Sequence, residues 1–492
     1  MKSDDVYKEF LVECAGFGDP PWDEELDEML PLWTEAAKKL GLTQKDMKFA
    51  TKEWIPRNFE VGLEGERKTI GLMVAEATDM MRAKEYKEKG QKLVYGVLPA
   101  QSPFYMALKK TNPEVNVYFP DVTIVALLSP FFHKIAPFLE YAEEQGVRYG
   151  CRHCALNKTR YAALRTGLIP IPDVSWIWGF VCDQAPNSDE FIQEYWNIEY
   201  PIVFSRIAHH GSAGEVEYKN DELVKYMGEI MRHGYENVCE KVEAEVDEKA
   251  IMEALKDRIN FVIRYGELLK LMAEDPAPLR GNLPLTILVP TFCAWNTGYK
   301  YANNALTALI KDAKERVKKG EGVVPKGSPK AMAWFIPNNN PFVARMFDES
   351  GVALTYCEGL LPSKAEFEMP RFTDPFEAQA EAFLKMSLLV NWRTKADLAI
   401  EKLETYDIDC MIWGFLDFDR WLGSDHKLCS RYVEEKTGKP CFYIEGDIYE
   451  DRDYSEEALR TRIETICEVV KARMTPVPKS LERGYGNVAN KS

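Results

Sequence analysis

Hydrophobic and polar positions change their period near residue 90. Before that point apolar side chains recur at helical spacing, for example in segments 31–40 and 70–82, which predicts a helical N-terminal region over residues 1–90. From Lys92 onward, short apolar runs alternate with polar segments of helical pattern. Such alternation is typical of parallel strands that are joined by crossover helices.

The expected strands form two sets, one on each side of a charged helical stretch. We predict a first α/β domain over residues 91–219, a helical bridge over 220–325, a second α/β domain over 326–475 and a flexible tail over 476–492. The predicted fold class is therefore α/β, with a cleft between two similar parallel-sheet halves. The expected strands are 92–98, 115–120, 174–181, 200–207, 331–337, 351–357, 407–417 and 439–447.

The segment 148–188 carries three of the eleven cysteines. Cys151 and Cys154 form a Cys-x-x-Cys pair at the expected start of a helix, and Cys182 follows the aromatic strand at 174–181. Residues just beyond the carboxyl end of a parallel strand lie where open α/β sheets bind their ligands. Cys182 is therefore the first position at which we expect chemistry.

These cysteines are also compatible with simpler roles. Free cysteine is often a small buried packing residue, and a Cys-x-x-Cys pair can be a thioredoxin-like redox motif or half of a zinc site. The redox motif belongs at the start of a βαβ unit, and a zinc site needs a second ligand pair at a spacing that the sequence lacks. A ferredoxin-type run of closely spaced cysteines is also missing. Widely separated cysteines instead predict a metal site assembled from several loops.

Two neighbouring histidines, His209 and His210, follow the strand expected at 200–207. They share a glycine-containing loop at the expected carboxyl edge of the sheet. Imidazole titrates near neutral pH, so either histidine could serve as a general acid or base. The alternative is a polar turn in which one histidine caps the backbone.

Composition excludes several classes of protein. The 492 residues, 46% hydrophobic and 12% aromatic, are enough for two or three domains with large cores. The formal charge of −16 argues against nucleic acid and against an anionic membrane surface as partners. The odd number of cysteines and a charged first segment without an apolar signal core favour the reducing cytoplasm.

Two further patterns bear on partners. The longest apolar stretch, at 122–139, is interrupted by polar residues and Pro130 and is too broken to span a membrane. The sequence contains neither a Gly-x-Gly-x-x-Gly motif nor a complete P-loop. ATP, if it is used, is therefore expected to be hydrolysed by another protein.

The order of several short motifs resembles the subunits of 2-hydroxyacyl-CoA dehydratases and of ATP-dependent benzoyl-CoA reductases. The resemblance extends over about Lys92–Ala472 and is weaker before it. Its motifs are Cys154 with Lys158 four residues on, Pro-Ile-Pro-Asp-Val at 170–174, Cys-Asp-Gln at 182–184, Asp-Pro-Ala-Pro-Leu-Arg-Gly-Asn at 275–282, the glycine-containing linker near 320, Glu-Glu-Lys-Thr-Gly-Lys-Pro at 434–440, Glu-Gly-Asp at 445–447 and the segment 455–464.

This resemblance implies two Rossmann- or flavodoxin-like domains and a [4Fe-4S] cluster that is held by three cysteines. It also implies a related second subunit and a separate activator protein, itself an iron–sulfur protein, that hydrolyses ATP. Carried over to this sequence, Cys154 or its neighbour Cys151 is the first cluster ligand and Cys182 is the second.

The third ligand is a departure from the family pattern. The family's third cysteine lies ten residues after the aspartate of an Asp-Gly pair and nineteen before the glycine of a Gly-x-Pro motif. Counted from Asp409 and back from Gly438, both spacings lead to Asp419. Three alternatives stay open: Asp419 ligates iron through its carboxylate, Cys429 or Cys151 takes its place, or the subunit has lost its cluster.

The reaction implied by the resemblance is the loss of water from a 2-hydroxyacyl-CoA. One low-potential electron on the thioester carbonyl makes a ketyl radical, which lets hydroxide leave from the α-carbon. The same delivery of electrons, repeated, would begin the reduction of an aromatic acyl-CoA, as in benzoyl-CoA reductase. A different class of function is a non-catalytic scaffold subunit or a zinc-stabilised protein, which the departure at Asp419 motivates.

Overall fold

The computed structural model describes most of the chain, and several of the gaps between the described ranges directly follow strands in the sequence. The described ranges are 5–96, 102–147, 153–178, 184–205, 216–287, 295–334, 338–359, 362–387, 390–415, 420–452 and 455–474.

The first sheet has four parallel strands in the order β2-β1-β3-β4. Residues on β1 and β3 are buried almost without interruption, which explains their continuous apolar sequence, because both faces of the sheet are covered by helices. The strands are β1 (Lys92–Gly96), β2 (Val115–Tyr118), β3 (Val174–Trp178) and β4 (Ile202–Ser205). The helices connected with them are α7 (Ser102–Thr111), α8 (Pro120–Phe132), α9 (Ala136–Glu144), α10 (Ala155–Arg165) and α11 (Gln184–Trp196).

The second sheet repeats this arrangement, with the order β6-β5-β7-β8 and parallel pairing throughout. In both sheets the chain starts at an inner strand, moves to one edge and then returns to build the other side, as in doubly wound flavodoxin-like folds. The strands are β5 (Lys330–Trp334), β6 (Ala353–Glu358), β7 (Cys410–Phe415) and β8 (Cys441–Glu445). The helices are α17 (Pro341–Glu349), α18 (Pro375–Leu384), α19 (Trp392–Thr405), α20 (Arg420–Thr437) and α21 (Glu456–Met474).

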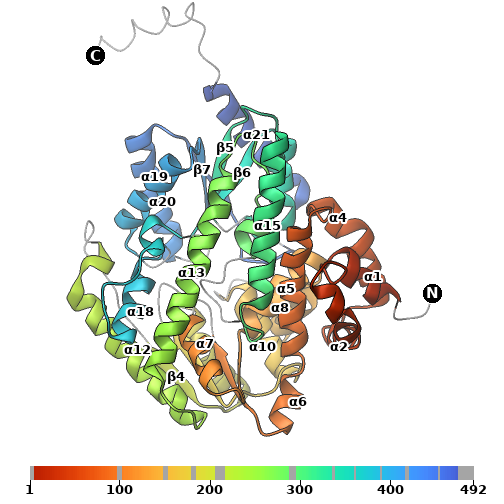
Figure 1. The fold of residues 1–492 in the computed structure, drawn as a ribbon, viewed down its shortest axis with the longest axis vertical. Coiled ribbons are helices and arrows are strands. Elements are labelled where there is room, and N and C mark those ends of the chain that lie inside the picture. Colours follow the sequence, from red (N-terminus) through yellow and green to blue (C-terminus); the bar gives the residue numbers. More distant parts are fainter. Residues whose placement is uncertain are drawn as a thin grey trace, which may run out of the picture.

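The bridge between the sheets is helical, as predicted. It contains α12 (Asp221–Lys241), α13 (Glu248–Met272), α14 (Leu283–Thr286) and α15 (Lys300–Lys319). The long helix α13 packs against α7 beside the first sheet and against α18 of the second half, and it runs beside α15 (Figure 1). The bridge therefore supports both halves at once.

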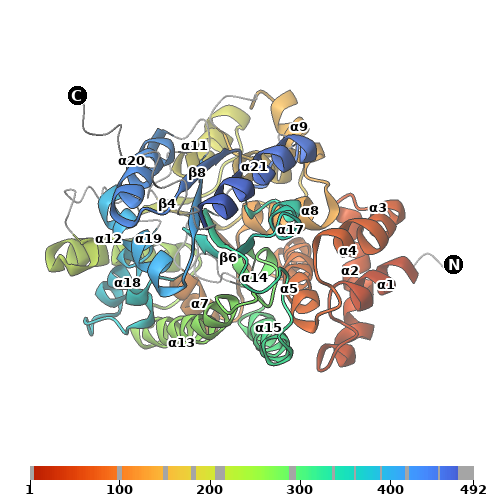
Figure 2. The ribbon, with the colours of Figure 1, turned by 90° about the horizontal axis from the view of Figure 1, so that it is seen from above.

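The N-terminal region is also helical, as predicted, and lies against one side of the molecule (Figure 2). Its innermost element is α5, which is buried along most of its length and packs against α15 and α8. Gly71 of α5 is needed for this packing, because a Cβ atom there would lie 2.1 Å from the carbonyl oxygen of Ala15. The helices are α1 (Asp5–Glu13), α2 (Leu26–Lys39), α3 (Gln44–Phe49), α4 (Ile55–Asn58), α5 (Glu64–Met80) and α6 (Ala83–Glu88).

The structure confirms the predicted fold class, and each of the eight expected strands overlaps a strand that forms. The long apolar stretch at 122–139 forms α8, a turn with His133 in the left-handed conformation, and the first part of α9. Among the helices that the structure describes, none combines the length and the apolar character needed to cross a membrane.

Candidate functional site

Cys154 stands at the start of α10, as the residue that precedes the first turn of the helix. Its backbone is extended, its side chain does not cap the helix, and the residue is 8% exposed. The amino end of a helix carries a partial positive charge that stabilises a thiolate or another anion. Cys154 is therefore placed where a cysteine can act as a metal ligand.

The start of α11 lies against this cysteine. The backbone N–H of Cys154 donates a hydrogen bond of 2.9 Å to Oε1 of Gln184. Gln184 is the first residue of α11 and comes two positions after Cys182 in the sequence. The fold thus brings Gln184, the last residue of the Cys-Asp-Gln motif, into contact with Cys154, which lies thirty positions earlier in the sequence.

The second half of the protein reaches the same point. The backbone N–H of Ala155 donates to Oδ2 of Asp447 at 3.2 Å, and Asp447 follows β8 by two residues. Its other carboxylate oxygen accepts a bond of 2.6 Å from the N–H of Ile448. The amino end of α10 therefore lies where the first half meets the carboxyl edge of the second sheet, which is the region in which α/β proteins bind ligands.

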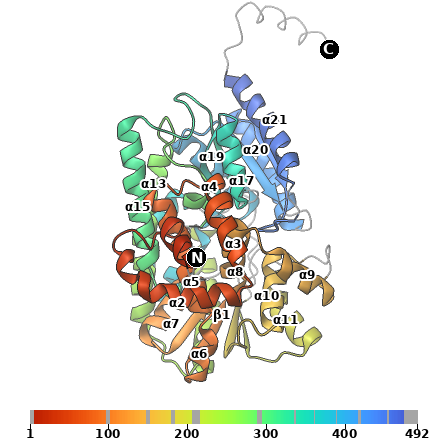
Figure 3. The same cartoon turned by 90° about the vertical axis from the view of Figure 1, so that its right-hand side faces the viewer.

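A charged network secures this junction a turn further along α10. Lys158, 3% exposed, pairs with Glu143 of α9 at 2.8 Å. Arg452, which follows β8, bonds to both oxygens of Glu143 at 2.8 and 3.0 Å and to Glu450 at 2.7 and 2.9 Å. Figure 3 shows α9 and α10 on the same side of the molecule as α20 and α21. Two-pronged bonds from one guanidinium to two carboxylates fix an orientation as well as a distance.

We expect Arg452→Met to loosen the contact between the two halves and to lower the free energy of unfolding by about 1–3 kcal/mol at neutral pH. The hydrogen bonds from Arg452, followed by those from Lys158, hold the pKa of Glu143 at about 2, although burial opposes them. A carboxyl with a lowered folded pKa stabilises the protein above its unfolded pKa, so this contribution is lost as the pH falls through about 4.5 to 2. Urea unfolding at pH 7 tests the expectation. Lys427→Met, at an exposed position of α20, serves as the control and should change stability by less than about 0.5 kcal/mol.

The other described cysteines lie elsewhere in the fold. Burial raises the pKa of each of these seven thiols, so they are protonated packing residues at neutral pH. They are Cys14, Cys239, Cys357, Cys410, Cys429, Cys441 and Cys467. Cys410 and Cys441 are the first residues of β7 and β8 and therefore lie at the opposite sheet edge from Asp447.

Cys429, which the sequence offers as an alternative third ligand, is fully buried on α20. Its thiol donates to the carbonyl oxygen of Trp392 at 3.1 Å, and burial raises its pKa to about 12. A thiol that is already used as a hydrogen-bond donor in an apolar setting is poorly prepared to become a thiolate ligand.

The remaining predicted site residues lie outside the described residues. These are Cys151, Cys182, Asp419, His209 and His210. Within the described residues, no group of three or more His, Cys, Asp or Glu side chains is arranged to hold a metal ion. The structure therefore describes Cys154 and the contacts of Gln184 and Asp447 with the start of α10. The complete set of cluster ligands stays a prediction.

An aromatic layer lies on one face of the strand β3. The rings of Trp176 and Trp178 on β3 lie 4.4 Å apart between centroids. The indole N–H of Trp176 donates to Ser205 at 2.9 Å, and that of Trp178 donates to Tyr105 at 3.1 Å. Both rings pack against α7, and the Trp176 ring also packs against α12, on the face of β3 opposite Ser175, whose hydroxyl accepts a bond from Arg160 of α10.

Three residues that surround Cys154 are not identified as site residues by the sequence pattern. Gln184 and Asp447 stand out only as parts of motifs, and the contacts that give them a role join residues far apart in the chain. His153 belongs to no motif: it bonds to the Tyr161 hydroxyl at 2.9 Å, and burial together with Lys158 lowers its pKa to about 4. Its position next to a candidate ligand is the one signal that the sequence offers for it.

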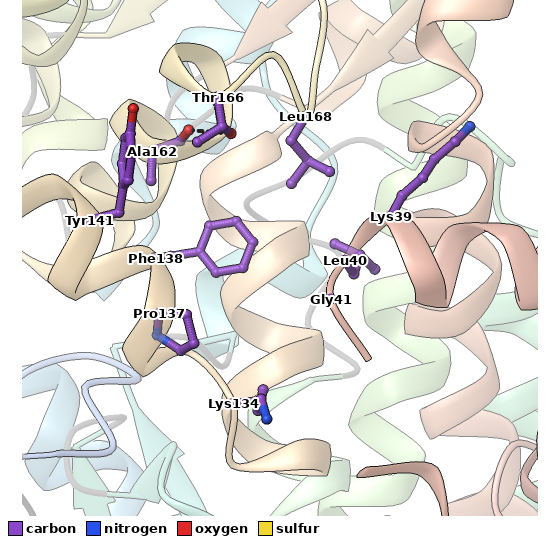
Figure 4. Close-up of a pocket in the computed structure, with 10 residues that line it drawn as sticks. All are labelled: Lys39, Leu40, Gly41, Lys134, Pro137, Phe138, Tyr141, Ala162, Thr166 and Leu168. Carbon is purple, nitrogen blue, oxygen red and sulfur yellow. Dashed lines mark hydrogen bonds between the residues drawn. The ribbon is translucent and has the colours of Figure 1, made fainter. Parts of the chain in front are cut away.

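A separate pocket of about 270 Å³ lies at the other end of α10 (Figure 4). Phe138 occupies its centre in the view, among side chains from the end of α2, from α9 and from α10. An eleven-residue helix is about 16 Å long, so this pocket is distinct from the site at Cys154. Its lining residues are Lys39, Leu40, Gly41, Lys134, Pro137, Phe138, Tyr141, Ala162, Thr166 and Leu168.

Comparison with known proteins gives two findings. Residues 116–470 match the sequence model of the family described as 2-hydroxyglutaryl-CoA dehydratase, D-component. The chain is also 22% identical over 284 residues to a subunit of benzoyl-CoA reductase from Thauera aromatica. That match includes 55% of this chain and 64% of the relative, so the chain spans somewhat less than two thirds of the relative's length.

Proposed function

The chain belongs to the family of the 2-hydroxyglutaryl-CoA dehydratase D-component, and we propose that it is the iron–sulfur subunit of a 2-hydroxyacyl-CoA dehydratase. The resemblance seen in the sequence is confirmed at the level of the family. The observation that carries the proposal further is the position of Cys154, at the meeting point of α10, α11 and the segment after β8.

We propose that Cys154 and Cys182 ligate a [4Fe-4S] cluster. The chemistry of the site suits such a group, because the amino end of α10 favours an anionic ligand. Asp419, Cys151 and Cys429 are the candidates for the third ligand, and the hydrogen bond and raised pKa of Cys429 make it the weakest of the three. When bound, the cluster would supply one electron of low potential to the thioester carbonyl of an acyl-CoA.

The residues around Cys154 have separate tasks in this proposal. Gln184 and Asp447 hold the first backbone N–H groups of α10 in place. A reaction that expels hydroxide also needs a proton to be taken from the β-carbon and one to be given to the leaving group, and we assign these transfers to His209 and His210.

A second candidate function is the reduction of an aromatic acyl-CoA, which is favoured by the match to the benzoyl-CoA reductase subunit. The family description speaks of a component and the relative's name of a subunit. We therefore propose a related second subunit and an ATP-hydrolysing iron–sulfur activator as partners.

The test is anaerobic purification of the chain with its second subunit, followed by iron, zinc and sulfide analysis and a visible spectrum. We expect about four iron and four sulfide per chain. Addition of activator, ATP and a 2-hydroxyacyl-CoA should then yield the unsaturated acyl-CoA. Ring reduction of benzoyl-CoA instead would support the second candidate. Zinc or no metal in protein kept free of oxygen would contradict both and support a scaffold role.

A further inference from the structure

A buried ion pair lies behind the two helix starts that meet at Cys154. Arg160 of α10 and Asp189 of α11 are both 0% exposed. Nε and Nη2 of Arg160 donate to Oδ1 of Asp189 at 3.1 and 2.9 Å, and Nη2 also donates to Oδ2 at 3.0 Å. Both oxygens of the carboxylate therefore face the guanidinium.

The pair also joins α10 and α11 to the first sheet. Nη1 of Arg160 donates to the carbonyl oxygen of Gly96, the last residue of β1, at 3.0 Å, and Nη2 donates to Oγ of Ser175 on β3 at 2.8 Å. Ser175 in turn donates to Asp189 at 2.8 Å, and the Tyr200 hydroxyl donates to the same carboxylate. Four elements of the first half are thereby fixed around one side chain.

The sequence positions of the pair give it a specific relation to the candidate ligands. Arg160 follows Cys154 by six residues, which is about 9 Å along the axis of α10. Asp189 follows Cys182 by seven residues and lies five residues into α11. The ion pair thus links α10, which begins directly after Cys154, to α11, which begins two residues after Cys182 in the sequence.

Stability alone does not explain such a pair. Removing two charges from water costs several kcal/mol, and apolar side chains of similar volume are often as stable or more stable in the same place. What apolar side chains cannot reproduce is the fixed direction of five guanidinium bonds to β1, β3 and α11.

We propose that Arg160 and Asp189 form a positioning pair that sets α10 against α11 and so fixes Cys154, at the start of α10, relative to the start of α11 for its role as a cluster ligand. The inference rests on the proposed iron–sulfur function. Groups outside the ligand shell that orient the ligands change metal affinity by about 10- to 100-fold when they are replaced. The pair should therefore control how firmly the cluster is held.

The experiment compares R160M/D189N with wild type, using the full chain together with its second subunit. The asparagine keeps one acceptor oxygen for Tyr200, and its NH2 group can donate to the Ser175 hydroxyl, while the charges and the guanidinium bonds are lost. The matched control is E358Q/K402M in the second half, where Lys402 bonds to both oxygens of Glu358 at 2.8 and 2.9 Å and the side chains are 1% and 0% exposed. The readouts are the thermal unfolding midpoint, the rate of iron release to a chelator, and the electron paramagnetic resonance spectrum of the reduced cluster.

We expect R160M/D189N to release iron about tenfold faster than wild type and to show a shifted resonance spectrum, while the control keeps both wild-type values. Equal release rates and spectra for R160M/D189N and wild type would overturn the positioning role. If R160M/D189N does not fold, Arg160→Lys, which keeps the charge but loses the planar fork, must show the same two changes for the inference to stand. A wild-type protein without iron would instead overturn the proposed function, which is a distinct result.

Discussion

Replacement of Cys154 by alanine should remove most of the iron and sulfide from the anaerobically purified protein, from about four of each per chain to less than about one. Cys154 is the described cysteine at the amino end of a helix, and its neighbours come from both halves of the molecule. The variant should still fold, because a small side chain is lost at the edge of a core. Iron and sulfide analysis with circular dichroism measures the two effects separately.

The matched control is Cys467→Ala on α21. This residue is 0% exposed, and burial raises the pKa of its thiol to about 12, so its loss should cost about 1–2 kcal/mol of stability and leave the iron content unchanged. The opposite pattern, iron retained in Cys154→Ala and lost in Cys467→Ala, would contradict the proposed site. Cys182→Ala should behave like Cys154→Ala.

The strands can be predicted from sequence because burial on both faces leaves a continuous apolar run, as in β3 and β5. The start of α11 is harder to predict, because Pro186 lies within its first turn and the helix begins at Gln184. The first turn of α11 is formed by tertiary contacts such as that between Gln184 and Cys154.

The long-range contacts that hold α10 and α9 against the second half cannot be predicted from the sequence in the same way. The contact between Ala155 and Asp447 joins residues 292 positions apart, and the pairing of Arg452 with Glu143 spans 309. No periodicity in one sequence specifies which charged residue meets which at such separations. Sequence patterns therefore predict Cys182 beyond the carboxyl end of a strand and Cys154 at the start of a helix, but they do not predict that Asp447 of the second half contacts that helix.

The second large effect is a dependence of the free energy of unfolding on pH, which arises from a buried carboxyl group on α5. Glu66 of α5 is 0% exposed, and burial, followed by the negative charge of Glu60, raises its pKa to about 8, although Arg280 and Arg316 act in the opposite direction. The ordinary value is 4.5. Between these two values the folded protein keeps a proton that the unfolded chain has released. The free energy of unfolding must then fall as the pH rises, by up to about 1.4 kcal/mol per pH unit from this group alone.

We expect Glu66→Gln to remove this dependence, because glutamine keeps the shape and polarity of the protonated acid and cannot ionise. Urea unfolding of the metal-free chain should show the variant close to wild type at pH 5 and more stable by about 2–3 kcal/mol at pH 7.5. Burial also raises the pKa of Glu76 to about 8, but this residue is present in both proteins and cancels in the comparison. Glu28→Gln on the exposed face of α2 should follow wild type at both pH values. Parallel stability curves for wild type and Glu66→Gln would mean that Glu66 is ionised in the folded protein, and its charge would then have to be balanced by Arg280 and Arg316 across the contact between α5 and the helical bridge.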